Sequence, residues 1–260
     1  MVSANNSFYV IYTIDSIASI IILLCDISFT RLFIFITPLC PIVSPYFYTP
    51  SIILKILYFL PNHMKAMKSV TQIFMVINRM SCVLFPFGYT KKWKDYLPVI
   101  IAFIFISPNL VTWNLLISRQ YVQNYYGGFI IVYIRKVIWA QLSLFHLIFL
   151  IISMAITIIC TSVTLYNLIM LPKRIKYSEK TLCLATIVIS TGFIAVAVCQ
   201  SFFAFCSQCH PYYLLIIQNL CYDFLNIGSP LVFIIMSTDL RKSIMSNQKT
   251  SMAIPAITSL

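Results

Sequence analysis

Repeated apolar runs, each long enough to cross a lipid bilayer, constrain this chain more than any other feature. A transmembrane helix needs about 20 predominantly apolar residues. Runs of this kind occupy roughly residues 8–29, 62–86, 96–117, 137–170, 181–205 and 212–236. Because they do not alternate apolar with polar residues, we expect helices and not a transmembrane β-barrel. The pattern therefore predicts an all-α fold, a polytopic transmembrane helix bundle with about six spans.

The composition also indicates lipid as the solvent. Of the 260 residues, 60% are hydrophobic and 9% are charged, whereas soluble domains carry about 25% charged residues. We assign residues 1–245 to one transmembrane domain and residues 246–260 to a cytoplasmic tail. The pattern does not fix the start of the second span, because four residues interrupt it: Pro61, His63, Lys65 and Lys68.

Lysine and arginine are distributed unequally over the two sides of this topology. The net charge is +12, from 18 Lys+Arg against 6 Asp+Glu. One side carries eleven of the 18: Arg79, Lys91, Lys92, Lys94, Lys173, Arg174, Lys176, Lys180, Arg241, Lys242 and Lys249. The other side carries seven, spread over longer loops: Arg31, Lys55, Lys65, Lys68, Arg119, Arg135 and Lys136. The positive-inside rule places the first side, and with it both termini, in the cytoplasm. Such an excess faces anionic membrane lipid, and we expect no nucleic-acid partner.

Three segments of the chain resemble one receptor family. They are NRMSCVLFP (78–86) with YTKKW (89–93), RLFIFITPLC (31–40) and DFLNIGSPLVFIIMSTDLR (223–241). In combination they resemble the nematode serpentine receptors of class gamma, a chemoreceptor family within the seven-helix G-protein-coupled receptors. The resemblance covers about residues 8–245. It implies an unknown extracellular small-molecule ligand, a heterotrimeric G protein as partner, and the plasma membrane of a sensory cilium as location.

The resemblance also implies a topology that differs from the six-span topology with a cytoplasmic N-terminus. The family has seven spans and an outer N-terminus, and the matching pieces begin at its second helix. We therefore expect this chain to lack the family's first helix. One side of the first span, which carries Asp15, would then face lipid, and the chain would be retained in the endoplasmic reticulum. A truncated, non-signalling receptor is accordingly one alternative function, and a small membrane transporter or channel is another.

The cytoplasmic side carries the residues that the resemblance implies for signalling. Asn78 and Arg79 stand where many seven-helix receptors have an acidic residue and arginine. Because Asn78 is neutral, it cannot form the same strong ion pair with Arg79, so we expect the resting contact to be weaker or to lie elsewhere. The candidate switch and G-protein-coupling residues are Asn78, Arg79, Met80, Lys91, Lys92, Trp93, Lys173, Arg174 and Arg241. Two plainer interpretations stay open, an interfacial anchor for Arg79 and a solvated positive rim for the loops.

Polar residues inside the apolar runs are the remaining candidates. Asp15 and Asp223 are acids within spans, and an intramembrane carboxylate is a functional candidate or a hydrogen-bonded structural acid. Asp15 is expected to share a polar or ion-binding cluster with Asn226 and Ser229. The candidate ligand-binding residues are Asn109, Trp113, His146, Tyr222 and Asp223. For His146, a core histidine is the alternative.

Catalytic and metal-binding chemistry has little support in the sequence. No nucleophile lies beside a base in any recognisable motif, and no glycine-rich phosphate loop occurs. No pair among His63, His146 and His210 has the spacing of a zinc site. We therefore expect neither an enzyme, nor a cofactor, nor a bound metal. Three cysteines fall on the outer side, where disulfides can form: Cys40, Cys206 and Cys209.

The six-span topology makes a direct prediction. Asn5 begins a glycosylation sequon, Asn5-Asn6-Ser7. With a cytoplasmic N-terminus it never meets the lumenal transferase, so we expect no glycan at Asn5. An antibody against a C-terminal epitope should bind only after the cells are permeabilised. A glycan at Asn5 together with that C-terminal result would require an odd number of spans.

Overall fold

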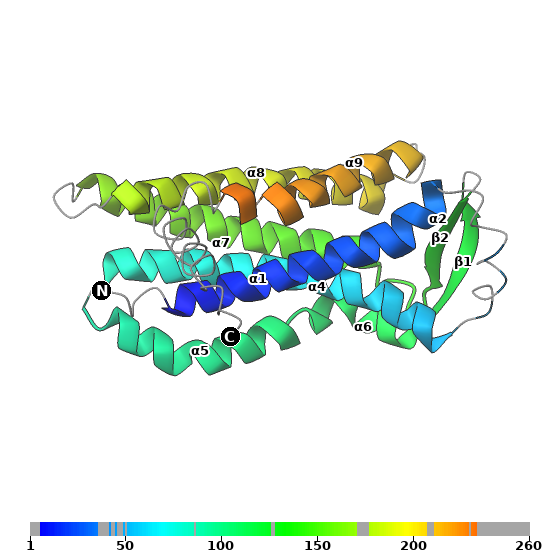
Figure 1. Ribbon diagram of the computed structural model, residues 1–260, viewed down its shortest axis with the longest axis horizontal. Helices are drawn as coiled ribbons and strands as arrows, with labels where there is room; N and C mark the ends of the chain where they lie inside the picture. Colours follow the sequence, from blue (N-terminus) through cyan, green and yellow to red (C-terminus); the bar gives the residue numbers. More distant parts are fainter. Residues whose placement is uncertain are drawn as a thin grey trace, which may run out of the picture.

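The computed structural model describes residues 6–35, 51–85, 87–125, 128–170, 177–206, 211–228 and 230–232, with Ile42, Pro45 and Thr49. These residues form long helices that run side by side, with a small hairpin at one end (Figure 1). The helices are α1 (Asn6–Cys25), α2 (Leu32–Phe35), α4 (Ile52–Leu84), α5 (Tyr89–Ile106), α6 (Asn109–Ile117), α7 (Leu142–Met170), α8 (Tyr177–Phe205) and α9 (Pro211–Asp223). Two π-helical turns continue α1 and α9: η1 (Asp26–Arg31) and η5 (Phe224–Gly228). The strands are β1 (Arg119–Tyr125) and β2 (Gly128–Ile134).

Four helical stretches among the described residues are long and apolar enough to cross a membrane: Ser7–Arg31, Tyr89–Ile117, Leu142–Asn167 and Ile187–Phe205. They coincide with the first, third, fourth and fifth predicted spans. The sixth predicted span, 212–236, contains α9 and η5 and runs into residues outside the described part of the chain. The second falls on α4, whose composition is more polar. The prediction of a helical polytopic fold is confirmed, and the number of spans stays a prediction.

Helix α4 begins well before the predicted second span. It starts at Ile52, after Ser51, whose hydroxyl accepts a hydrogen bond from the Leu54 amide at 3.1 Å. It then continues through Pro61 to Leu84. Its proline, histidine and lysines suggested an interruption in the sequence. They do not break the helix, because Pro61, His63 and Lys68 are buried in the bundle.

Two further boundaries differ from the predictions. Helix α5 starts at Tyr89, so Lys91, Lys92 and Trp93 lie in its first turns and not in a loop. The turn before it depends on Gly88, whose φ of 81° favours glycine. Helix α7 starts at Leu142 and not near 137, because residues 135–141 connect strand β2, which ends at Ile134, to the helix through bends and turns.

The hairpin was not predicted. Strands β1 and β2 are antiparallel, from Arg119 opposite Ile134 to Tyr125 opposite Gly128. Val122 and Ile131 pack with Leu54 of α4 in a small second core. The hairpin is also tied to the bundle by the Gln120 side chain, which donates to the Leu115 carbonyl at 2.7 Å. It therefore covers the end of the bundle where α4 begins (Figure 1).

Helix α4 is the centre of the bundle. It packs against α1 on one side and α7 on another, and α7 in turn packs against α8 (Figure 1). The main core draws on all of these helices and includes Ile11, Val70, Leu150 and Val196. The turn between α4 and α5 and the start of α8 lie at the end opposite the hairpin. Residues of α1 therefore meet the second half of α4 side by side, from Ser7 beside Asn78 to Asp15 beside Lys68.

Gly192 allows α8 to approach η5 closely, which generates a prediction. A Cβ atom at Gly192 would lie 2.6 Å from Leu225 Cδ2 and 2.9 Å from Phe224 Cδ1. Overpacking of this kind costs about 1–3 kcal/mol, so Gly192→Ala should lower the melting temperature of the purified protein in detergent. Adding Leu225→Ala should recover part of the loss. Val198→Ile adds a methyl group at a half-exposed position of the same helix, and should leave the melting temperature unchanged.

Candidate functional site

Charged side chains meet in pairs inside the bundle. Among the described residues there are three ion pairs, each joining different elements: Lys68–Asp15, Lys65–Asp26 and Arg31–Asp223. They group into two clusters. The central cluster is Asp15, Ser19, Lys68 and Thr71, and the outer cluster is Asp26, Arg31, Lys65, Tyr222 and Asp223. A third, inner cluster contains Ser7, Phe8, Asn78, Arg79 and Tyr89.

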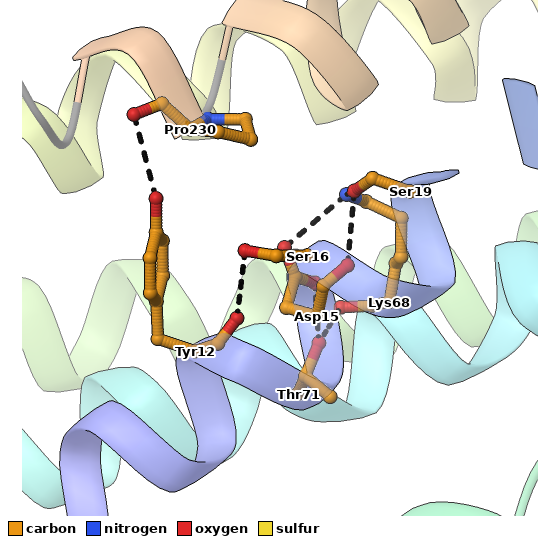
Figure 2. A network of polar contacts seen from close by, with 7 residues as sticks. All are labelled: Tyr12, Asp15, Ser16, Ser19, Lys68, Thr71 and Pro230. Atoms are coloured by element: carbon orange, nitrogen blue, oxygen red, sulfur yellow. Dashed lines mark hydrogen bonds and ion pairs between the residues drawn. The ribbon is translucent and has the colours of Figure 1, made fainter. Parts of the chain in front are cut away.

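The central cluster is a fully buried ion pair between α1 and α4 (Figure 2). Asp15 is 3% exposed and Lys68 is 4% exposed. The Lys68 Nζ lies 3.2 Å from Asp15 Oδ2 and also donates to the Ser19 hydroxyl. Thr71 donates to the other carboxylate oxygen, Asp15 Oδ1, at 2.7 Å. Both oxygens of the buried carboxylate are therefore hydrogen-bonded, as a charge in a low-dielectric interior requires.

This arrangement corrects two expectations. Lys68 lies inside the bundle and not in an outer loop, and Asp15 is covered and does not face lipid. The predicted cluster of Asp15 with Asn226 and Ser229 is also not formed as expected. Asn226 is buried, and its amide has no hydrogen-bond partner among the described residues. Ser229 lies outside the described residues.

The outer cluster joins η1, α4 and α9. Asp26 is 5% exposed, and its carboxylate oxygens lie 3.2 and 3.3 Å from the Lys65 Nζ. The same ammonium group lies 4.5 Å from the centre of the Tyr222 ring, a cation–π contact. The Arg31 Nη2 donates to Asp223 Oδ1. Both Asp26 and Arg31 belong to η1, and π-helical turns inside α-helices frequently occur at functional sites.

The structure brings two of the five predicted ligand-binding residues together, Tyr222 and Asp223. His146 is buried in α7, where its Nε2 lies 3.3 Å from the Asn62 carbonyl of α4. Asn109 donates to the Ile106 carbonyl at 3.0 Å, across the break between α5 and α6. Trp113 packs against the exposed Trp139, with ring centroids 5.9 Å apart. Asn109 and Trp113 are therefore not part of the outer cluster.

The sequence analysis did not predict Asp26, Lys65 and Arg31 as site residues. For Asp26 and Lys65, their spacing along a helix could have indicated a role. Lys65 and Lys68 are three positions apart, so they share one face of a helix. Asp15 and Asp26 are separated by about three helical turns, which also places them on one face. Two acids and two lysines with matching faces indicate two cross-helix pairs. The pairing of Arg31 with Asp223 could not be read in this way, because it depends on the contact between η1 and α9.

The inner cluster holds the predicted switch residues. Asn78 is 2% exposed; its Nδ2 donates to the Ser7 hydroxyl at 3.3 Å, and its Oδ1 accepts from Tyr89 at 2.7 Å. The Arg79 guanidinium lies over the Phe8 ring, 4.3 Å from its centre. Where the resemblance led us to expect a weakened ion pair, the structure thus shows an amide bridge and a cation–π contact.

The remaining coupling candidates differ in accessibility. Lys91 and Lys92 are exposed, Met80 is half-buried, and Trp93 is buried in the core beside Tyr89. Lys173, Arg174 and Arg241 lie outside the described residues.

The described residues contain one disulfide-bonded cysteine and several thiols. Cys206 is disulfide-bonded. Five other cysteines are thiols outside any disulfide: Cys25, Cys82, Cys160, Cys199 and Cys221. Cys40 and Cys209 lie outside the described residues, so the pairing of Cys206 is not assigned. No three metal-binding side chains gather within the described ranges.

Long apolar helices with charges paired between them define a helical multi-pass membrane protein, and known proteins identify its class. Residues 2–244 match the family model described as "Srg family chemoreceptor", so the chain belongs to the Srg family of serpentine chemoreceptors. It is 46% identical over 237 residues to serpentine receptor class gamma-16 of Caenorhabditis elegans, covering 91% of this chain and 73% of the relative. It is 42% identical over 259 residues to class gamma-13 of the same organism, covering 98% and 77%. The chain is therefore a membrane receptor and not an enzyme, as the sequence predicted.

The central cluster predicts a strong coupling between two residues. Removing one partner of a buried ion pair costs about 3–5 kcal/mol. Lys68→Met and Asp15→Asn should therefore each lower the melting temperature of the protein in detergent. The double variant should lose much less than the sum of the two, because no charge is left unpaired. Lys94→Met, at an exposed position of α5, is the control and should have no effect. Additive losses in the double variant would show that the pair is not coupled.

Proposed function

We propose that this chain binds a small extracellular molecule in the outer half of the bundle and activates a heterotrimeric G protein at its cytoplasmic end. Membership of a chemoreceptor family supports this function over a transporter or channel. We expect the chain in the plasma membrane, in the sensory cilium that the family resemblance implies. The observation that carries the proposal is the alignment of three polar clusters along the same pair of helices, α1 and α4.

The three clusters offer a physical route for the signal. Asp26, Asp15 and Phe8 follow one another along η1 and α1, and their partners Lys65, Lys68 and Arg79 follow one another along α4. A ligand that changes the outer cluster changes how η1 meets α4. Because the same two helices also form the inner cluster, a shift between them alters the contacts of Arg79.

The amide bridge of Asn78 and the contact of Arg79 with Phe8 are interactions of modest strength. A cation–π contact contributes about 0.5–2 kcal/mol, and a hydrogen bond between neutral groups contributes about 0.5–1.5 kcal/mol. Differences of this size are within the range that a ligand supplies by binding one arrangement better than another. Release of Arg79 beside the exposed Lys91 and Lys92 would present a positive surface to the G protein.

The role of Arg79 can be tested in cells that express the chain with a G protein reporter and are screened with small molecules. Arg79→Ala should reduce the evoked signal severalfold at an unchanged surface level. Arg79→Lys should restore little of it, because lysine lacks the planar guanidinium group. Phe8→Leu removes the ring under Arg79 and should raise the signal without ligand, whereas Tyr9→Leu is the neighbouring control.

Two results would contradict these assignments. A full signal from Arg79→Lys would make Arg79 an interfacial anchor. If the chain reaches the surface and no variant or compound changes G protein activity, the proposed function fails.

A further inference from the structure

We propose that Arg31 binds the carboxylate of an acidic small-molecule ligand, and that this ligand displaces Asp223 from the guanidinium group. This inference rests on the proposed function and names the chemical class of the ligand. It starts from an unusual feature of the outer cluster, the incomplete use of the donors of Arg31.

The guanidinium group of Arg31 is only partly satisfied. Its Nη2 donates to Asp223 Oδ1, whereas its Nε is buried and has no hydrogen-bond partner among the described residues. A guanidinium has five N–H donors in a fixed plane, and a carboxylate fits two of them at once. Asp223 therefore occupies one donor of an edge that is built for two.

The unpaired Nε of Arg31 indicates the sign of the charge on the ligand. An unused donor calls for an acceptor, and beside a fixed positive charge the strongest acceptor is a carboxylate. A cationic ligand would need a free carboxylate. Both oxygens of Asp26 already contact Lys65, whose ammonium group also covers the Tyr222 ring. The outer cluster is therefore better prepared for an anion.

Exposure identifies the Arg31–Asp223 pair as the accessible one. Its side chains are 26% and 23% exposed, against 14% and 6% for Lys65 and Asp26. A ligand carboxylate that takes both Nε and Nη2 removes Asp223 from Arg31. Because Arg31 belongs to η1 and Asp223 ends α9, this exchange breaks the ion pair between these two elements. Binding is thus coupled to a change in helix contacts, which a receptor needs.

The competition between ligand and Asp223 makes a distinctive prediction. Arg31→Gln should weaken the binding of a carboxylate at least tenfold, and Arg31→Lys should weaken it less. Asp223→Asn should strengthen binding severalfold, because the internal competitor has lost its charge. A residue pair with a purely structural role would not give this gain. Arg119→Gln removes an exposed arginine of the hairpin, and should leave binding unchanged.

The experiment uses the purified full chain in detergent micelles, with hexanoate and its neutral counterpart hexanamide as probes. Melting temperatures are followed against probe concentration at constant ionic strength. Hexanoate should stabilise the protein at concentrations at least tenfold lower than hexanamide. Equal effects of the two probes, no effect of hexanoate, or hexanoate binding by Arg31→Gln at wild-type strength would overturn the inference.

Further measurements distinguish a failure of this inference from misfolding of a variant and from a failure of the proposed function. The melting temperature of each variant without a probe shows that it folds, and Arg31→Lys provides the test if Arg31→Gln does not fold. Binding of hexanoate through Arg31 without any G protein activation would contradict the proposed function alone. A G protein signal evoked by neutral compounds and indifferent to Arg31→Gln would contradict the carboxylate site alone.

Discussion

The buried ion pair between Lys68 and Asp15 is the interaction on which the rest of the bundle depends. A charge removed from water is tolerated only where a partner and further hydrogen bonds compensate for its lost hydration. Lys68 can meet that condition only if α1 lies antiparallel to α4 with Asp15 at the same level. Once this level is fixed, Asp26 meets Lys65 and Phe8 meets Arg79 along the same two helices. One pair thus sets the register of the whole α1–α4 contact.

Pairing also sharpens the charge argument for the topology. Arg31, Lys65 and Lys68 counted as outer-loop cations in the sequence, but all three are paired with acids inside the bundle. Four cations then remain on the outer side: Lys55, Arg119, Arg135 and Lys136. The positive-inside rule counts charges that must stay out of the membrane in loops, and a paired side chain within a helix does not belong to that count. Arg79 lies within α4 over the Phe8 ring and leaves the other count in the same way, so four cations stand against ten and the contrast grows.

The sequence predicted the parts of the fold that depend on apolar length, and it failed where a polar residue has a partner far along the chain. Four predicted spans coincide with apolar helices, and the family resemblance is confirmed. The predicted second span begins too late compared with helix α4. In the sequence Lys65 and Lys68 look like loop residues, but in the structure Asp26 and Asp15 pair with them. The hairpin falls in the loop predicted between the third and fourth spans, and it was missed because a short apolar run such as its second strand does not by itself indicate a strand. Of the predicted site, five residues take part in clusters: Asp15, Asn78, Arg79, Tyr222 and Asp223.

The three clusters contain different types of interaction, and the type changes along the bundle from the outer to the inner end. The outer and central clusters consist of opposite charges, whereas the inner cluster combines an amide bridge with an arginine on an aromatic ring. Opposite charges in a low-dielectric interior permit few alternative arrangements, because each separation leaves a charge without a partner. A hydrogen-bonded asparagine and a stacked arginine can exchange their contacts for water or for another protein at small cost. The end of the α1–α4 contact with Asn78 and Arg79, which is cytoplasmic in the predicted topology, is therefore the part that can rearrange while the centre holds. Under the proposed function, a ligand replaces a partner at the outer end only if it brings its own charge, and the rearrangement takes place at the end where a G protein would bind.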